Sequence, residues 1–239
     1  MQRYQIFLII PNKKCIFVIV IIKRNLYMEK KIHEMSVREY DEHCEKVMCS
    51  FLDEHFYREI GFSWKERVLD KERQVKGLDI ILKRDGITYN IDEKAAIRYT
   101  NGLKTFALEL SFLNRKGNRV DGWLIDEKKV NDYFVFVWIN KIEGEHIIDT
   151  NTFKDVDVAL VSKEKIMLHL ESLGWDIDKL LIKDERIRDG FDRNLGDIKK
   201  NGCKFSYSEH LFEKPINILL PKETYFKIAD IHKRIILDK

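Results

Sequence analysis

Asp79, Asp92 and Lys94 are residues whose types and spacing could do chemistry together. Two carboxylates held close to each other can share one Mg²⁺ or Mn²⁺ ion, because these hard cations prefer oxygen ligands. Such an ion neutralises a phosphate group and lowers the pKa of an attacking water molecule. An ammonium group beside the ion can position that water or stabilise negative charge in the transition state. The three side chains can act in this way only if the fold brings them together.

A tight turn between two predicted strands would bring the two aspartates together. The runs Leu78–Lys83 and Ile87–Glu93 are rich in strand-forming residues, and Asp85-Gly86 lies between them. An Asp-Gly pair between such runs predicts a two-residue hairpin turn, because both turn positions need a positive φ. In the register that this turn fixes, Asp79 lies directly opposite Asp92.

The same register divides the hairpin into two faces. The predicted core face carries the apolar side chains Leu78, Ile80, Leu82, Tyr89 and Ile91. The opposite face carries the polar side chains Asp79, Thr88, Asn90, Asp92 and Lys94. Directly opposed residues have Cβ atoms ~4.5–5.5 Å apart, and like charges there destabilise a sheet by roughly 0.2–1 kcal/mol. A divalent cation would compensate this repulsion, so Asp79 and Asp92 are predicted metal ligands. The alternative interpretation is a solvated surface that only resembles a site.

Glu109 is a further acidic candidate, on what we expect to be the next strand. In the segment Thr105–Phe112 large apolar residues alternate with small or polar ones, which is typical of a strand with one buried face. Glu109 falls on the polar face and could join the site. A simply exposed glutamate is the alternative.

The chain resembles the PD-(D/E)XK nuclease superfamily, which has the restriction-endonuclease-like fold. The matching residues are Gly77-Leu78-Asp79 and, after a gap of 12 residues, Asp92-Glu93-Lys94-Ala95. The resemblance covers roughly residues 36–140. It implies that Asp79 and Asp92 bind the metal and that Lys94 assists catalysis. It also implies an acid from the preceding helix, for which Glu54 is the candidate, and a downstream acid, for which Glu109 fits.

The function implied is that of a metal-dependent nuclease, with Mg²⁺ or Mn²⁺ as cofactor and DNA, or alternatively RNA, as substrate. A homodimer is compatible with this reading, and no membrane partner is expected. Many domains of this fold have lost catalysis, so an inactive nucleic-acid-binding or protein-interaction module is the alternative hypothesis.

Basic residues that follow the motif are candidates for contacts with phosphate groups. They are Arg98, Lys104, Arg115, Lys116 and Arg119. An ordinary solvated surface explains the same residues equally well.

The expected fold class is α/β, with a mixed central sheet flanked by helices. Beyond the hairpin, the expected strands are 105–112, 133–139, 156–161 and 215–220. The expected helices are 36–56, 162–173, 176–189 and a final helix from 221 to about 237. Residues 113–131 are expected to form turns and a short helix. Tyr133–Ile139 is apolar at every position, which indicates a central strand buried on both faces.

The composition agrees with a globular protein. The chain has 239 residues, of which 44% are hydrophobic and 35% charged, and its net charge of +3 neither requires nor excludes nucleic acid. Four cysteines are too few for a disulfide scaffold, which favours a reducing compartment and predicts a cytoplasmic location.

Residues 1–30 differ from the rest, because they hold six basic residues, one acidic residue and two apolar runs, Ile6–Ile10 and Cys15–Ile22. Each run is far shorter than the ~20 residues of a membrane helix. Three interpretations of this segment stay open. It is a translated upstream region with the natural start at Met28, a β-hairpin at the domain edge, or a weak membrane or export segment. We expect residues 31–239 to form the nuclease-like domain, in which the part after about residue 150 either completes the sheet or is accessory.

Overall fold

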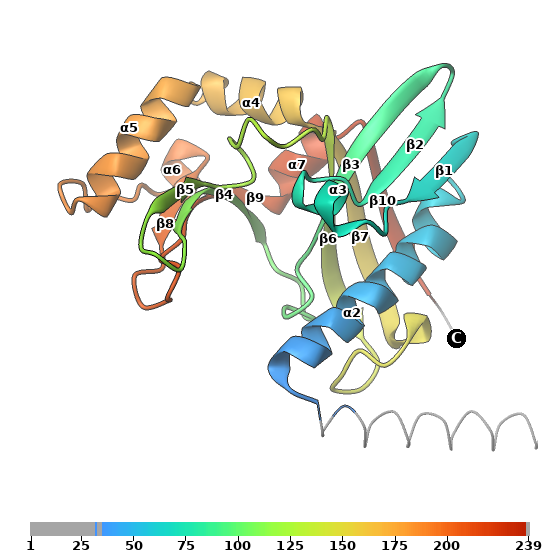
Figure 1. The fold of residues 1–239 in the computed structure, drawn as a ribbon. Helices are drawn as coiled ribbons and strands as arrows, with labels where there is room; N and C mark the ends of the chain where they lie inside the picture. Colours follow the sequence, from blue (N-terminus) through green and yellow to red (C-terminus); the bar gives the residue numbers. More distant parts are fainter. Residues whose placement is uncertain (1–31, 33–34, 238–239) are drawn as a thin grey trace, which may run out of the picture.

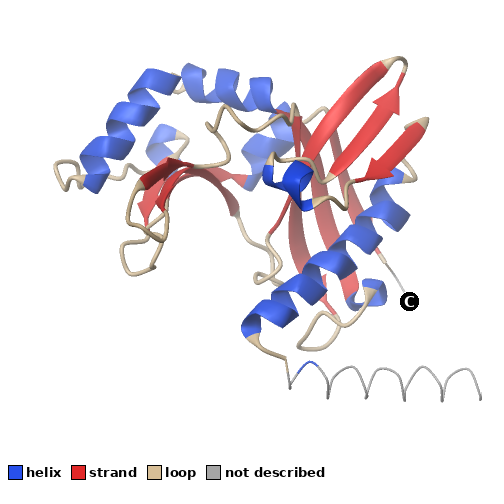
Figure 2. Ribbon diagram, in the orientation of Figure 1, coloured by secondary structure: helices blue, strands red, loops and turns tan. Residues whose placement is uncertain are grey.

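A mixed six-stranded β-sheet forms the centre of the molecule. The computed structural model describes residue 32 and residues 35–237. The strand order is β1-β2-β3-β6-β7-β10, in which β3 and β6 are parallel and all other neighbours are antiparallel. The strands are β1 (Trp64–Arg67), β2 (Ile80–Arg84), β3 (Ile87–Ala95), β6 (Tyr133–Ile142), β7 (Phe153–Ser162) and β10 (Ile231–Ile236). The expected α/β fold with a mixed central sheet and helices is confirmed (Figures 1 and 2).

Four further strands form a smaller antiparallel sheet in the order β5-β4-β9-β8. They are β4 (Thr105–Leu113), β5 (Arg119–Asp121), β8 (Lys204–Tyr207) and β9 (Ile216–Pro221). A cluster of buried apolar side chains joins this sheet to one face of the central sheet. Phe106 of β4 lies with its ring centroid 5.0 Å from that of Phe136 and 5.4 Å from that of Trp138, both in β6. The two sheets therefore share one hydrophobic core.

Helix α2 (Val37–Leu52) covers the other face of the central sheet (Figure 1). The Ser36 hydroxyl accepts a hydrogen bond from the Glu39 amide, and the Glu39 carboxylate accepts one from the Ser36 amide, which is a capping box. The buried side chains of the helix are Cys44, Met48, Phe51 and Leu52. A π-helical turn, η1 (Asp53–Tyr57), follows directly. The helix predicted over 36–56 is confirmed.

Shorter helices cap the two sheets. They are α3 (Lys71–Val75), η2 (Thr150–Thr152), α4 (Lys163–Ser172), α5 (Ile177–Arg188), α6 (Ile198–Asn201) and α7 (Lys222–Ile228). The apolar sides of α4, α5 and α7 contribute to the core shared by the two sheets. The helices predicted over 162–173 and 176–189 are confirmed as α4 and α5. The described residues contain no helix with the length and apolar character needed to cross a membrane.

The β2–β3 hairpin has the predicted turn and register. Asp85 and Gly86 have φ values of 52° and 77°, as a two-residue hairpin turn requires. Ile80 pairs with Ile91 and Leu82 pairs with Tyr89. All four of these paired side chains are buried in the core beneath α2, so the assignment of faces is also confirmed.

The strand predicted over 105–112 forms, but in a different sheet from the one expected. It is β4, which pairs with β5 and β9 and not with the hairpin. Its alternation holds only as far as Leu110, because the pairing with β9 shifts between Glu109 and Ser111. A bulge of this kind inserts one residue and reverses the facing of those that follow. Ser111 is consequently buried and Phe112 is not.

The helix predicted from 221 to about 237 is wrong in its second half. Helix α7 ends at Ile228, and the chain then forms β10 along the edge of β7, where Ile231 pairs with Leu160. Strand β7 would otherwise expose a row of unpaired backbone groups, and β10 satisfies them. The short strands β1, β5 and β8 were also not predicted, and residues 113–131 form β5 and turns without the short helix.

The chain beyond residue 150 supplies strands to both sheets. β7 and β10 belong to the central sheet, and β8 and β9 belong to the smaller one. Residues 1–30, for which three interpretations stand, lie outside the described residues.

Gly122 is a position where the fold leaves no room for a side chain. A Cβ atom there would lie 2.4 Å from the Glu109 carbonyl oxygen and 2.7 Å from Glu109 Cγ. We expect Gly122→Ala to lower the free energy of unfolding by about 1–3 kcal/mol, since packed backbone would have to move. Urea denaturation measures this loss, and Lys128→Ala, at an exposed position of the same connection, should change stability by less than about 0.5 kcal/mol. Equal stability of the two variants would contradict the clash.

Candidate active site

Asp79 and Asp92 lie close to each other at the open end of the β2–β3 hairpin. The regular β2–β3 register ends at the pair Ile80–Ile91, and the Asp79 amide also donates to the Ile91 carbonyl, at 2.9 Å. The Asp79 carboxylate accepts a hydrogen bond of 2.8 Å from the Glu93 amide through Oδ2. Asp92 is only 3% exposed. The two carboxyl groups lie close enough for the charge of Asp92 to act on Asp79, with Asp92 buried and Asp79 half-buried.

The electrostatics of Asp79 reflect this burial. Desolvation, and next the charge of Asp92, raise the pKa of Asp79 to about 7, and the hydrogen bond from the Glu93 amide only partly opposes them. At neutral pH the pair therefore resists carrying two negative charges unless a cation is present.

Asp92 has one oxygen with a partner and one without. Its Oδ1 accepts a hydrogen bond of 2.6 Å from Lys94 Nζ. Its Oδ2 is buried and has no hydrogen-bond partner among the described residues. A buried carboxylate oxygen without a partner is costly, and a bound cation or water would satisfy it.

Lys94 is held on the same side of β3 as Asp92. Its side chain is 25% exposed, and its ammonium lies 5.2 Å from the ring centroid of Trp123. Trp123 belongs to the connection between β5 and β6, so the smaller sheet helps to place the lysine. Burial beside an aromatic face strengthens the attraction between the cation and the ring.

Glu109 reaches this site from the smaller sheet. Burial raises its pKa, while a hydrogen bond from the Trp123 backbone and the charge of Lys94 lower it. The residue is therefore near Lys94, although its strand is not the neighbour of the hairpin that was expected. Sequence reasoning chose the residue but assigned it to the wrong sheet.

The structure does not bring Glu54, the acid expected from the preceding helix, to the site. The Glu54 side chain is 57% exposed and lies 3.6 Å from the His55 ring nitrogen Nε2. Helix α2 covers the face of the central sheet opposite to the one that carries Asp92 and Lys94.

Glu93, the middle residue of the Asp-Glu-Lys run, points to the opposite face of β3. Its carboxylate accepts hydrogen bonds from Arg67 Nη1 at 2.8 Å and from the Tyr57 hydroxyl at 2.6 Å. Arg67 also donates to Asp53 Oδ1 at 2.8 Å. This network fixes β3 to the end of α2 and to β1, and so it holds the strand that carries Asp92 and Lys94.

The predicted phosphate-contacting residues do not form one group. Arg98 pairs with Asp41, and Lys104 is exposed. Arg115 and Lys116 are exposed at the tip of the turn between β4 and β5. Arg119 is bound by two carboxylates, Asp184 at 2.6 Å and Asp121 at 2.7 Å. Its charge is therefore already compensated.

A magnesium ion fits the donor set of the site. The described residues contain no group of three or more His, Cys, Asp or Glu side chains arranged for a metal. Mg²⁺ usually takes one or two carboxylates and completes its shell with water and substrate phosphate. Asp79 and Asp92, with the unpartnered Asp92 Oδ2, meet that requirement.

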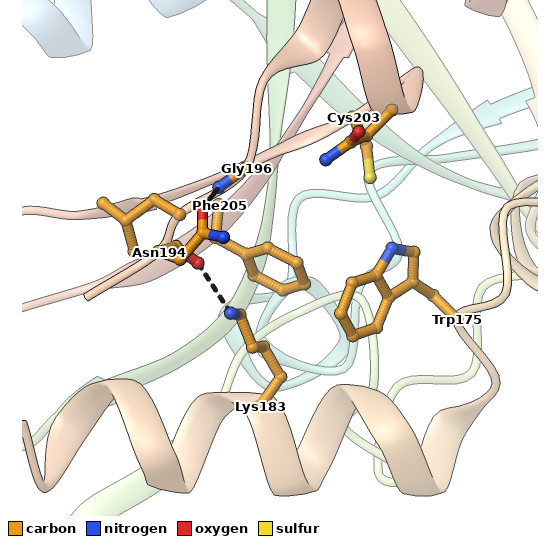
Figure 3. A pocket seen from close by; sticks show the side chains of 8 residues that line it. Trp175, Lys183, Asn194, Gly196, Cys203 and Phe205 are labelled. Carbon is orange, nitrogen blue, oxygen red and sulfur yellow. Dashed lines mark hydrogen bonds between the residues drawn. The ribbon is translucent and has the colours of Figure 1, made fainter. Parts of the chain in front are cut away.

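A separate small pocket lies between α5 and the segment that leads into β8. It has a volume of about 200 Å³, and Trp175, Phe205 and Cys203 line it together with Lys183 (Figure 3). Lys183 Nζ is bound to Asp192 at 2.6 Å and to the Asn194 carbonyl at 2.7 Å. The pocket contains none of the predicted site residues.

Comparisons of the chain with protein-family models, curated proteins and solved structures found no significant match.

The raised pKa of Asp79 predicts how stability depends on pH. The native state keeps a proton on Asp79 up to about pH 7, whereas the unfolded chain releases it near the usual value of 3.8. The contribution of this group to stability therefore falls as pH rises from about 4 to about 7. We expect the wild type without divalent ions to lose more stability over this range than Asp79→Asn, as measured by urea denaturation. At pH 8, Mg²⁺ should raise the Tm of the wild type and not that of the variant. Parallel pH curves would show that Asp79 is not buried beside a charge.

Removal of Arg67 should destabilise the fold strongly. Arg67→Met leaves the Glu93 side chain, 9% exposed, without its cation, and breaking a buried pair costs about 3–5 kcal/mol. The matched control is Arg73→Met, since Arg73 and its partner Glu66 are both 41% exposed. Loss of that pair should cost at most about 1 kcal/mol. Similar unfolding free energies for the two variants would contradict a buried role for Arg67.

Proposed function

We propose that this protein is a metal-dependent nuclease that hydrolyses phosphodiester bonds of DNA. The observation that carries the proposal is the pair formed by half-buried Asp79 and buried Asp92, in which Asp92 has one unpartnered oxygen and a lysine ammonium 2.6 Å from the other. Like charges in this arrangement are unfavourable without a cation. Two carboxylates, a divalent ion and a lysine are the components that phosphodiester hydrolysis requires.

Each residue of the site has a part in this reaction. Asp79 and Asp92 would hold Mg²⁺ or Mn²⁺ through their carboxylate oxygens. When bound, the ion supplies charge for the scissile phosphate and acidifies a water molecule. The Lys94 ammonium can hold the attacking water or stabilise the negative charge that develops on the phosphate oxygens. The Asp92 carboxylate and the Trp123 ring hold the ammonium in place for this role.

Glu109 is proposed as the acid on the far side of Lys94. Its pKa is raised by burial, so its carboxylate is more basic than that of an exposed glutamate. A carboxylate of this kind next to an ammonium can orient that group and accept a proton from water. Because the Trp123 amide holds Glu109 and the Trp123 ring lies against Lys94, one residue fixes both partners.

We also propose the restriction-endonuclease-like fold for the half of the chain that carries the site. Helix α2 followed by β1, the β2–β3 hairpin and the parallel strand β6 supports this assignment. The connection between β3 and β6 carries β4 and β5, where such folds usually have a helix. This difference brings the smaller sheet, with Glu109 and Trp123, against the proposed active site.

Cleavage assays with purified protein test the function. Plasmid and single-stranded DNA should be cut in the presence of Mg²⁺ or Mn²⁺ and remain intact with EDTA. Asp92→Asn and Lys94→Met should each lower the cleavage rate by about 100-fold or more, because each removes a group that acts on the reacting phosphate. Asp85→Asn is the matched control, since Asp85 lies in the same hairpin with its side chain 88% exposed.

The possible outcomes separate the hypotheses. Metal-dependent cleavage that both site variants lose and Asp85→Asn keeps would support the nuclease. Cleavage that persists in Asp92→Asn would refute this site. DNA binding without cleavage would favour an inactive binding module, and cleavage of RNA in place of DNA would change the substrate. Far-ultraviolet circular dichroism of each variant shows whether a loss of activity reflects a loss of fold.

A further inference from the structure

Lys163 lies near Asp92 in the structure. Across the sheet, Asp92 pairs with Phe134, and Phe134 pairs with Val161. Side chains in paired positions point to the same face, and residues two apart along a strand do so as well. Lys163 is the first residue of α4, directly after β7, and it lies near enough to Asp92 for the charge of that carboxylate to act on it.

The backbone fixes the position of Lys163 relative to the site. Its amide donates to the Asp132 carbonyl at 2.8 Å, and the Asp132 amide donates to the Asn90 carbonyl at 2.9 Å. Asn90 precedes Asp92 by two residues, whereas Lys94 follows it by two. The Lys163 backbone therefore lies at the level of Asn90, two strands from β3, whereas Lys94 lies on β3 itself beyond Asp92.

The Lys163 ammonium has no partner among the described residues. The side chain is half-buried, and no hydrogen bond or ion pair is formed by its Nζ. Burial lowers its pKa, while the charges of Asp126, Asp132 and Asp92 act in the opposite direction. Taking an unpaired ammonium out of water is unfavourable, so this lysine weakens the fold unless something binds it.

A second cation lies nearby. Lys129 acts on Lys163 by repulsion, and its Nζ donates to the Val75 carbonyl at 2.8 Å. Lys129 thus already has a partner, and Lys163 retains its full capacity to bind an anion. With the carboxylate pair neutralised by a divalent ion, the attraction of Asp92 for the Lys163 ammonium falls, and Asp126 and Asp132 remain as its acidic neighbours.

We propose that Lys163 binds a second phosphate of the nucleic-acid strand, next to the phosphate that is cleaved. This inference rests on the proposed function, because it takes the Asp79–Asp92 pair as the place of the scissile phosphate. Lys94 and Lys163 then contact successive phosphates of one strand, on either side of the ion. Lys163 is a substrate-binding residue that sets the path of the strand across the sheet.

Binding to a labelled oligonucleotide tests the proposal without relying on cleavage. The experiment uses the full chain with Asp92→Asn, a fluorescein-labelled single strand and fluorescence anisotropy over a range of salt concentrations. Adding Lys163→Met should weaken binding several-fold and reduce the slope of log K against log[salt] by about 0.7, the value of one lost phosphate contact on a single strand. Lys163→Arg should restore the slope, since it keeps the charge.

Lys165→Met is the matched control. Lys165 lies on the same helical turn, but its ammonium is bound to Asp230 at 2.5 Å. It should leave both the affinity and the salt slope unchanged. In the cleavage-competent protein, Lys163→Met should raise KM more than it lowers kcat, and its Tm should not fall. A lower Tm with an unchanged salt slope would overturn the proposal in favour of a structural lysine.

The failure of this inference is distinct from failure of the nuclease proposal. If the wild type cleaves DNA and Lys163→Met behaves like Lys165→Met, the second phosphate contact is refuted and the nuclease stands. If the wild type binds DNA through Lys163 without cleaving it, the contact stands and the catalytic proposal is refuted. If the wild type shows no binding even at low salt, both are refuted.

Discussion

Two carboxyl groups, of buried Asp92 and half-buried Asp79, interact at the open end of a hairpin, and the repulsion between their charges is the constraint around which the site is built. Asp92 is 3% exposed, and burial together with the charge of Asp92 holds the pKa of Asp79 near 7. Isolated charges of one sign are expensive to bury, so the fold places compensating groups around the pair. Lys94 contacts Asp92 Oδ1, the Glu93 amide contacts Asp79 Oδ2, and the buried Asp92 Oδ2 is left without a hydrogen-bond partner among the described residues.

The period of a β-strand lets one short run serve two purposes. Asp92 and Lys94 point toward the proposed active site, and Glu93 between them points toward α2. There Glu93 forms a buried network with Arg67 and Tyr57. Of the three residues of this run, Asp92 and Lys94 are thus available to a ligand, and Glu93 ties the strand to its neighbours. The rigid network around Glu93 supports the geometry of Asp92 and Lys94.

The smaller sheet completes the site from the other side. Its connection to β6 carries Trp123, which lies against the Lys94 ammonium and donates through its amide to Glu109. Gly122 allows that connection to pass against the Glu109 backbone, since any side chain would collide with it. The face that carries Asp92 is therefore bounded by residues distant in sequence, including Lys163 at the end of β7.

Local rules were enough to predict the hairpin. Asp85-Gly86 fixes the turn, and the turn fixes the register from Arg84–Ile87 to Ile80–Ile91, next to which Asp79 and Asp92 lie. The capping box at Ser36 and the apolar run after Tyr133 likewise specified a helix and a buried strand, because these signals depend on residues close together in the chain. The last helix failed, since its second half pairs as β10 with the distant strand β7.

Only the tertiary structure decided which residues surround the pair. The sheet to which β4 belongs and the bulge that buries Ser111 both depend on contacts between elements far apart in sequence. The same holds for Trp123 and Lys163, which belong to no motif. Their positions follow from how the two sheets share one core, and no periodic pattern in the sequence around these residues indicates that packing.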